Sequence, residues 1–213
     1  MNLIAAISLR NDPLIDFNKP FLAEDSIDQV VNNMGGLYVK TIHDTEQLLD
    51  YKVLSEVIDI LSVSKVIDVY GVGISYQSAA MFQYKMMSLD QVVRVNHSSN
   101  DQIKQAQYST KDTVAIIISY SGETREICEI VDEIKKREGT IIAITSTHKN
   151  YLRIRSNYCL TLCTKEKDEY KLEAFSSKIS ADYIMDLIYS MLFQKKYNVY
   201  LDDKRERTHQ ING

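Results

Sequence analysis

Five short apolar runs alternate with helix-like segments along most of this 213-residue chain. The apolar runs lie at residues 66–70, 92–95, 113–118, 140–145 and 158–163. The helix-like segments lie at residues 75–89, 99–107, 123–138, 149–154 and 175–196. Short apolar strands separated by helices are typical of a parallel sheet that is covered on both faces. The pattern therefore predicts an α/β fold, a three-layer α-β-α sandwich with a five-stranded parallel sheet.

A long helix is predicted ahead of this alternating region, over about residues 26–49. Ser26 and Gln29 resemble a capping box, and apolar residues then recur at helical spacing. A second helix is predicted at about 52–63. The first helix is too apolar for the surface of a lone subunit, so we expect a homodimer.

Composition excludes several classes of protein. No run of eighteen apolar residues is present and the first residues lack a secretory signal pattern, so no membrane partner is expected. The net charge of −4 argues against a basic face for nucleic acid. The cysteines form no CxxC pair and the histidines are scattered, which predicts reduced thiols, a cytoplasmic location and no metal site.

The first turn of interest is the sequence GVGIS, residues 71–75, at the end of the first predicted strand. Ligands of open parallel sheets bind beyond the carboxyl ends of the strands, where strand order reverses. Gly71 and Gly73 would let the backbone approach a ligand, and Ser75 can cap the next helix. A dinucleotide fingerprint would need glycine where Tyr76 stands, and no Gly-Lys-Ser/Thr follows for a P-loop. We therefore expect no nucleotide cofactor.

The second turn is SYSGET, residues 119–124, after the third predicted strand. Ser119, Ser121 and Thr124 would surround the amino end of the next helix, where free N–H groups and the helix dipole favour an anion. Gly122 permits a sharp turn with its N–H groups pointing inward. This combination predicts a site for a sugar phosphate that does not require a lysine.

Helix capping and turn closure are the alternative explanation for these hydroxyl groups. A third hydroxylic turn, Thr145-Ser146-Thr147, follows the fourth predicted strand and should lie at the same edge of the sheet. Three such turns at one edge favour a ligand site over capping alone.

These motifs carry a family resemblance. G-x-G-x-S after the first strand, S-x-S-G-E-T after the third and I-x-I-T-S after the fourth resemble the SIS (sugar isomerase) domain, which has a flavodoxin-like fold. The segment EAFSSKISADYIMDLIYSMLF, residues 173–193, is similar to the last helix of the RpiR family of transcription regulators. The matching positions are Ser176, Ser177, Lys178 (where the family usually has arginine), Asp186, Leu187 and Tyr189.

The resemblance, which covers about residues 26–196, implies a domain organisation. Residues 1–22 would be the remnant of a preceding helix and its linker, residues 23–200 the SIS domain, and residues 201–213 a flexible tail. RpiR regulators carry a helix-turn-helix (HTH) domain before the SIS domain, and this chain has no room for one. DNA would therefore be a partner only through that missing domain.

The function implied is that of a phosphosugar-binding effector domain in an RpiR-family transcriptional regulator of carbohydrate metabolism. The residues expected to bind the phosphosugar are Gly71, Gly73, Ser75, Ser119, Ser121, Gly122, Thr124 and Ser176.

An enzyme, either a sugar-phosphate isomerase or a related lyase, is the alternative. Isomerisation needs a base beside the reacting carbons, and SIS isomerases resemble one another in having a glutamate near the position of Glu173. His97 and Glu123 are the other candidates, and Glu123 belongs to the binding motif itself. Glu173 is better explained as a first-turn charge at a helix start, and a lone histidine is more often structural. The chain therefore has a clear candidate site for phosphate but no convincing residue to act as the acid or base of a reaction. This favours sensing over catalysis.

Overall fold

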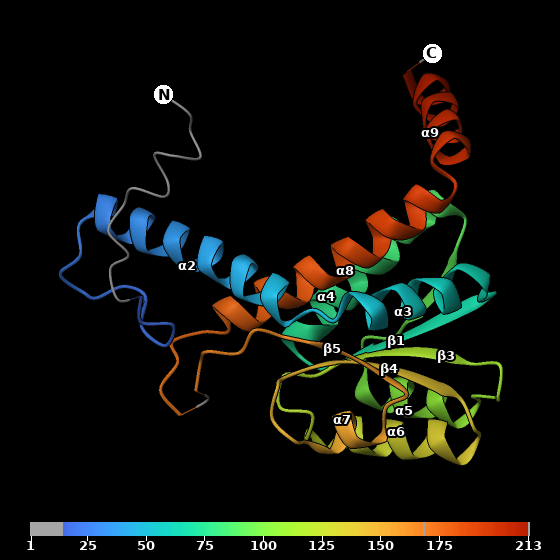
Figure 1. Cartoon of the computed structure of the whole chain (residues 1–213), viewed down its shortest axis with the longest axis horizontal. Coiled ribbons are helices and arrows are strands. Elements are labelled where there is room, and N and C mark those ends of the chain that lie inside the picture. Colours follow the sequence, from blue (N-terminus) through green and yellow to red (C-terminus); the bar gives the residue numbers. More distant parts are fainter. Residues whose placement is uncertain (1–14, 168, 213) are drawn as a thin grey trace.

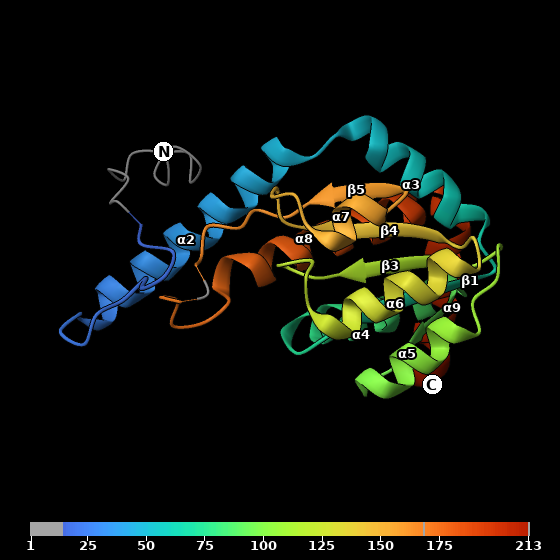
Figure 2. The same cartoon turned by 90° about the horizontal axis from the view of Figure 1, so that it is seen from below.

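A computed structural model describes residues 15–167 and 169–212 of the chain. Five parallel strands form one sheet in the order β2-β1-β3-β4-β5. Their bounds are β1 Val66–Gly71, β2 Val92–Val95, β3 Val114–Ile118, β4 Thr140–Thr145 and β5 Tyr158–Thr161. The predicted α/β sandwich with a five-stranded parallel sheet is confirmed (Figures 1 and 2).

Helices cover both faces of the sheet. On one face lie α3 (Tyr51–Val63), α4 (Ile74–Met86), the short 3₁₀ helix η1 (Met87–Leu89) and α8 (Phe175–Lys195). On the other lie α5 (Ser99–Gln107), α6 (Arg125–Lys136) and α7 (Tyr151–Arg155). Alternate residues of one strand enter opposite cores, as Ile116 and Ile117 of β3 do. Because both faces are buried, the strands read as continuous apolar runs.

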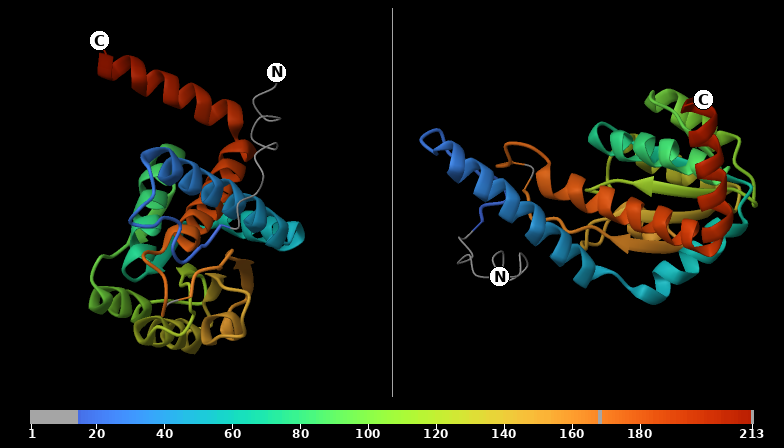
Figure 3. Two further views of the ribbon diagram at one scale, coloured as in Figure 1. Left: turned by 90° about the vertical axis from the view of Figure 1, so that its left-hand side faces the viewer. Right: turned by 90° about the horizontal axis from the view of Figure 1, so that it is seen from above.

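The long first helix is α2 (Ile27–Leu48), and its predicted capping box is present. Ser26 Oγ accepts from the Gln29 amide, and the Gln29 side chain accepts from the Ser26 amide. Only Leu37, Thr41 and Thr45 of this helix are buried. Its amino-terminal half projects past the sheet, where Figure 3 shows it lying clear of the other helices.

Most of the segment that was expected to be a flexible tail, residues 201–213, lies in helix α9 (Tyr197–Asn212), which projects from the body (Figures 1 and 3). The start of α9 packs against Phe193, which contacts the Tyr197 ring edge-on and the Tyr200 ring at a tilt. The expected helix remnant before the linker falls on residues 1–14, outside the described residues. No helix in the described part is long and apolar enough to cross a bilayer.

Candidate functional site

The topology creates a crevice between β1 and β3. From β1 the chain goes to β2 on one side, whereas β3 pairs with β1 on the other side. The carboxyl ends of these two strands are in register, with Gly71 opposite Ile118. The loops that follow them, 72–73 and 119–124, therefore diverge at the switch point where ligands of such sheets bind.

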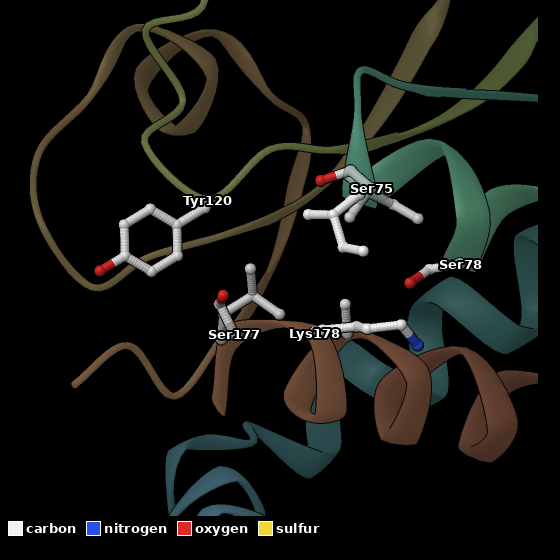
Figure 4. Close-up of a pocket in the computed structure, with 9 residues that line it drawn as sticks. Ser75, Ser78, Tyr120, Ser177 and Lys178 are labelled. Atoms are coloured by element: carbon white, nitrogen blue, oxygen red, sulfur yellow. The ribbon is translucent and has the colours of Figure 1, made fainter. Parts of the chain in front are cut away.

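A cavity of about 210 Å³ lies at this point, and we call it the serine cavity. Its lining residues are Val72, Ile74, Ser75, Ile118, Ser119, Tyr120, Ser121, Thr124, Ile127 and Lys171. A smaller cavity of about 20 Å³ adjoins it and shares Ile74, Ser75, Ile118 and Tyr120. Figure 4 shows this smaller cavity, in which Ser75 and Tyr120 face Ser177 and Lys178 of α8. The two cavities form one crevice from the α6 end to the α8 end.

Two serine hydroxyl groups of the 119–124 loop are placed so that they can donate hydrogen bonds to a ligand. Ser119 Oγ accepts from the Gly122 amide at 3.2 Å, and Ser121 Oγ accepts from the Glu123 amide at 3.2 Å. Each serine oxygen thus accepts a hydrogen bond from a backbone amide of the loop. Its own O–H group can still donate to a ligand. Thr124 is the N-cap of α6, and its side chain makes no capping hydrogen bond. The cavity therefore combines hydroxyl donors with the amino end of a helix, which suits an anion.

Gly122 shapes this loop. Its φ is +66°, and a Cβ there would lie 2.1 Å from Asn150 Oδ1. Its carbonyl accepts from the Leu152 amide at 3.1 Å. Both the left-handed backbone and the contact with Asn150 require glycine.

The third hydroxylic turn supports the loop and does not line the serine cavity. Thr145 Oγ1 and the Ser146 amide both donate to the Tyr120 carbonyl, at 3.4 and 3.3 Å. Asn150 Nδ2 donates to Thr145 Oγ1 at 3.1 Å. For this turn, the alternative explanation by turn closure is the one that the contacts fit.

The expected glycines of the first turn act through the backbone. A Cβ on Gly71 would lie 2.8 Å from the backbone of Ser75, so only glycine allows α4 to start this close to β1. The Gly71 amide and carbonyl are both bonded to the buried Gln102 side chain of α5, at 3.1 and 2.9 Å. Gly73 is the N-cap of α4 with a φ of 61°. Neither glycine lines the serine cavity or the smaller cavity beside it, whereas Ser75 lines both.

Ser176 is fully buried and lies outside both cavities. Its hydroxyl donates to Glu166 Oε2 at 3.0 Å, and the amides of Ser176 and Ser177 donate to the same carboxylate. Glu166, itself 3% exposed, therefore occupies the amino end of α8 as an internal anion. The structure separates Ser176 from the other expected site residues.

The candidate bases also lie away from the crevice. His97 is exposed and contacts the Tyr76 ring edge-on, with centroids 4.7 Å apart. Glu173 is exposed and accepts from the Ala174 amide at 2.9 Å. Glu123 Oε1 accepts from the Tyr151 amide at the start of α7. Neither His97 nor Glu173 lines either of the two cavities of the crevice.

Lys171 is the charged residue that lines the serine cavity, and the sequence analysis did not identify it. It comes from the segment between β5 and α8, and its Nζ lies 5.2 Å from the centre of the Tyr120 ring. The segment has no hydrophobic periodicity, so no local pattern could place this lysine. The structure thus adds a positive charge to a site that was expected to need none. Among the described residues, no group of three or more histidine, cysteine or acidic side chains is placed to hold a metal.

Comparison with known proteins shows which proteins this chain resembles. A relative that is 24% identical over 188 residues is an uncharacterised HTH-type transcriptional regulator of Clostridium perfringens. The match covers 88% of this chain and 67% of that regulator. Residues 60–191 also match the SIS domain family.

Two of the solved structures that share the fold are those of transcription factors. The Vibrio vulnificus NanR protein complexed with ManNAc-6P superposes with a TM-score of 0.78 at 21% identity, covering 89% of this chain and 69% of that one. The sugar isomerase domain of an RpiR transcription factor from Sphaerobacter thermophilus gives 0.74 at 13% identity, covering 85% and 99%. The match over residues 60–191 spans more than half of the chain, and the chain belongs to the SIS domain family.

Proposed function

We propose that this chain is the effector domain of an RpiR-family transcriptional regulator of carbohydrate metabolism and that it binds a sugar phosphate. The observation that carries the proposal is the convergence on one cavity of Ser75, Ser119, Ser121, Thr124 and Lys171. The phosphoryl group would occupy the serine cavity at the amino end of α6. The sugar would extend along the crevice toward Ser177 and Lys178.

The lining residues support sensing over turnover. Isomerisation or elimination needs a base within hydrogen-bond reach of the reacting carbons. The carboxylates and the imidazole considered above are engaged elsewhere or lie off the cavities. Lys178, at the α8 end, is paired with Asp182 at 2.5 Å.

The regulatory part of the proposal draws on the relatives. The matched regulators are longer than this chain, which spans about two thirds of each of the two. We propose that DNA is contacted by an HTH domain that precedes the SIS domain, that the domain pairs as a homodimer, and that it acts in the cytoplasm.

Isothermal titration calorimetry tests the binding site. ManNAc-6P, glucose 6-phosphate and unphosphorylated glucose are titrated into wild type and into Ser121→Ala. At least one phosphorylated sugar should bind, glucose should not, and the variant should lose about 1.5–3 kcal/mol of binding free energy. Ser62→Ala, an exposed serine on α3, is the matched control.

Two results would contradict the proposal. Equal affinity of Ser121→Ala and wild type would remove Ser121 from the site and contradict the proposed position of the phosphoryl group. The enzyme alternative would be favoured if NMR showed that the bound sugar phosphate is converted to an isomer or an elimination product.

A further inference from the structure

The wall of the serine cavity that carries Lys171 is a segment we call the strap, residues 164–167 and 169–174. On its cavity side, the Tyr120 hydroxyl donates to the Glu166 carbonyl, and Lys171 lies over the Tyr120 ring. On its other side, the Glu166 carboxylate holds the amino end of α8. The strap therefore touches both the 119–124 loop and the last helix of the sandwich.

The strap is also fastened to the segment that enters the domain. Asn18 Oδ1 accepts from the Lys167 amide at 2.7 Å, and the Asn18 carbonyl accepts from the Leu172 amide at 2.8 Å. Inside the strap, the Lys167 carbonyl accepts from the amides of Tyr170 and Lys171. A closed turn thus carries Lys171, and one residue of the entering segment is bonded to both ends of that turn.

The entering segment, residues 15–22, is packed onto the domain by further contacts. The Phe21 ring lies edge-on to Phe175 with centroids 6.5 Å apart, and Pro20 is buried. Phe17 lies under Lys165 Nζ at 5.1 Å, and Lys165 is ion-paired with Asp44 of α2. The segment is therefore held by α8 and by the strap, and the strap is itself tied to α2.

We propose that the strap couples occupancy of the serine cavity to residues 15–22, with Lys171 as the residue that contacts the anion. This inference rests on the proposed function, because it requires an anion in that cavity. An anion there attracts the Lys171 ammonium, which orders the turn. The ordered turn presents the Lys167 and Leu172 amides to Asn18, so the entering segment is held more tightly when the cavity is filled.

Coupling of this kind is reciprocal. If the anion tightens the hold of Asn18 on the strap, then loss of that hold must weaken the anion, even though Asn18 does not line the cavity. Asn18→Ala should therefore lower the affinity for inorganic phosphate by about 5-fold. Lys171→Met, which keeps length and removes charge, should lower it by about 10-fold.

Hydrogen–deuterium exchange of the full chain, with saturating inorganic phosphate against chloride at equal ionic strength, tests the coupling. In wild type, phosphate should slow exchange both in residues 119–124 and in residues 15–22. In Asn18→Ala, the loop should still be protected and residues 15–22 should not respond. Asn18→Asp retains the acceptor atoms and should restore the response, and Asn198→Ala, an exposed asparagine on α9, should behave as wild type.

The outcomes separate this inference from the proposed function. Protection of residues 119–124 with no change in residues 15–22 of wild type would overturn the coupling and leave the anion site in place. A response of residues 15–22 that persists in Asn18→Ala would also overturn it. Failure of phosphate to protect residues 119–124 would overturn both.

Discussion

Gly122 is the residue of the 119–124 loop with the least freedom to change. We expect Gly122→Ala to destabilise the fold by at least about 1–2 kcal/mol, because an alanine with a φ of +66° is strained before its Cβ meets Asn150. Phosphosugar binding should fall further, since any relief of the clash moves the amides of the loop. Urea denaturation and calorimetry measure the two effects.

Gly35 provides the matched control for this substitution. It lies on an exposed part of α2, and nothing would lie within 4 Å of an added Cβ. Gly35→Ala should therefore stabilise the protein by about 0.5–1 kcal/mol through the helix propensity of alanine. If both substitutions changed stability alike, the steric explanation for Gly122 would be wrong.

The roles of single residues were predictable where they depend on local sequence. The 119–124 loop follows directly on a buried strand, and its hydroxyl groups could be placed at a helix start from that fact alone. Lys171 and Glu166 could not be placed, because their positions depend on packing between segments distant in the chain. Ser176 was expected in the site by family resemblance, but its hydroxyl donates a hydrogen bond to the Glu166 carboxylate.

At the scale of the element, α8 depends on a cap from outside the helix. Glu166→Gln keeps the shape of the side chain and removes the charge that three donors of Ser176 and Ser177 share. The free energy of unfolding should fall by about 1.5–3 kcal/mol in urea denaturation. Glu173→Gln, an exposed neighbour, should change it by less than about 0.5 kcal/mol. Equal effects would contradict the capping role of Glu166.

The strap is also tied to α2 by the ion pair between Lys165 and Asp44. Because this pair needs the ionised carboxylate, its contribution to stability depends on pH. Burial alone would raise the pKa of Asp44, but hydrogen bonds and charges from Lys165 and Lys40 outweigh it and lower the pKa below its ordinary value. A lowered folded-state pKa means that the ionised form stabilises the fold. This stabilisation is complete above the unfolded-state pKa of about 3.9 and is lost as the pH falls through the folded-state pKa.

We therefore expect Asp44→Asn to destabilise the protein at pH 7 and to lose this difference from wild type progressively below about pH 4. Urea denaturation across this range gives the measurement. Asp59→Asn, at an exposed ion pair with Lys195, should differ little from wild type at any pH. A difference for Asp44→Asn that stayed constant into acid would contradict the assignment.

Helices and strands were predictable from sequence where the spacing of apolar residues reflects which side chains are buried. The strands and their covering helices were found because each is apolar on the side, or sides, that meet a core. Helix α9 was predicted to be a tail because its sequence at residues 202–210, DDKRERTHQ, shows no apolar face. The strap has no regular structure, so its place beside the cavity follows only from the fold.

The whole molecule leaves an apolar stripe uncovered on α2. Ile27, Val31, Tyr38 and Ile42 are 82, 64, 39 and 38% exposed. At 100° per residue these four fall on one side of the helix. A long exposed stripe of this kind is typical of a surface that meets another chain, and we expect a second copy of this chain to cover it.

We expect wild type to sediment as a dimer, at twice the 24.5 kDa of one chain. Val31→Glu places a charge in the middle of the stripe, and burying it unpaired in an interface would shift the equilibrium toward monomer. Sedimentation equilibrium over a range of concentrations measures the change. Val63→Glu, an equally drastic substitution at an 81% exposed position on α3, should leave the dimer intact. If wild type stayed monomeric at every concentration, the expected homodimer would be wrong, and the cost of leaving this apolar helix face in water would have to be met in another way.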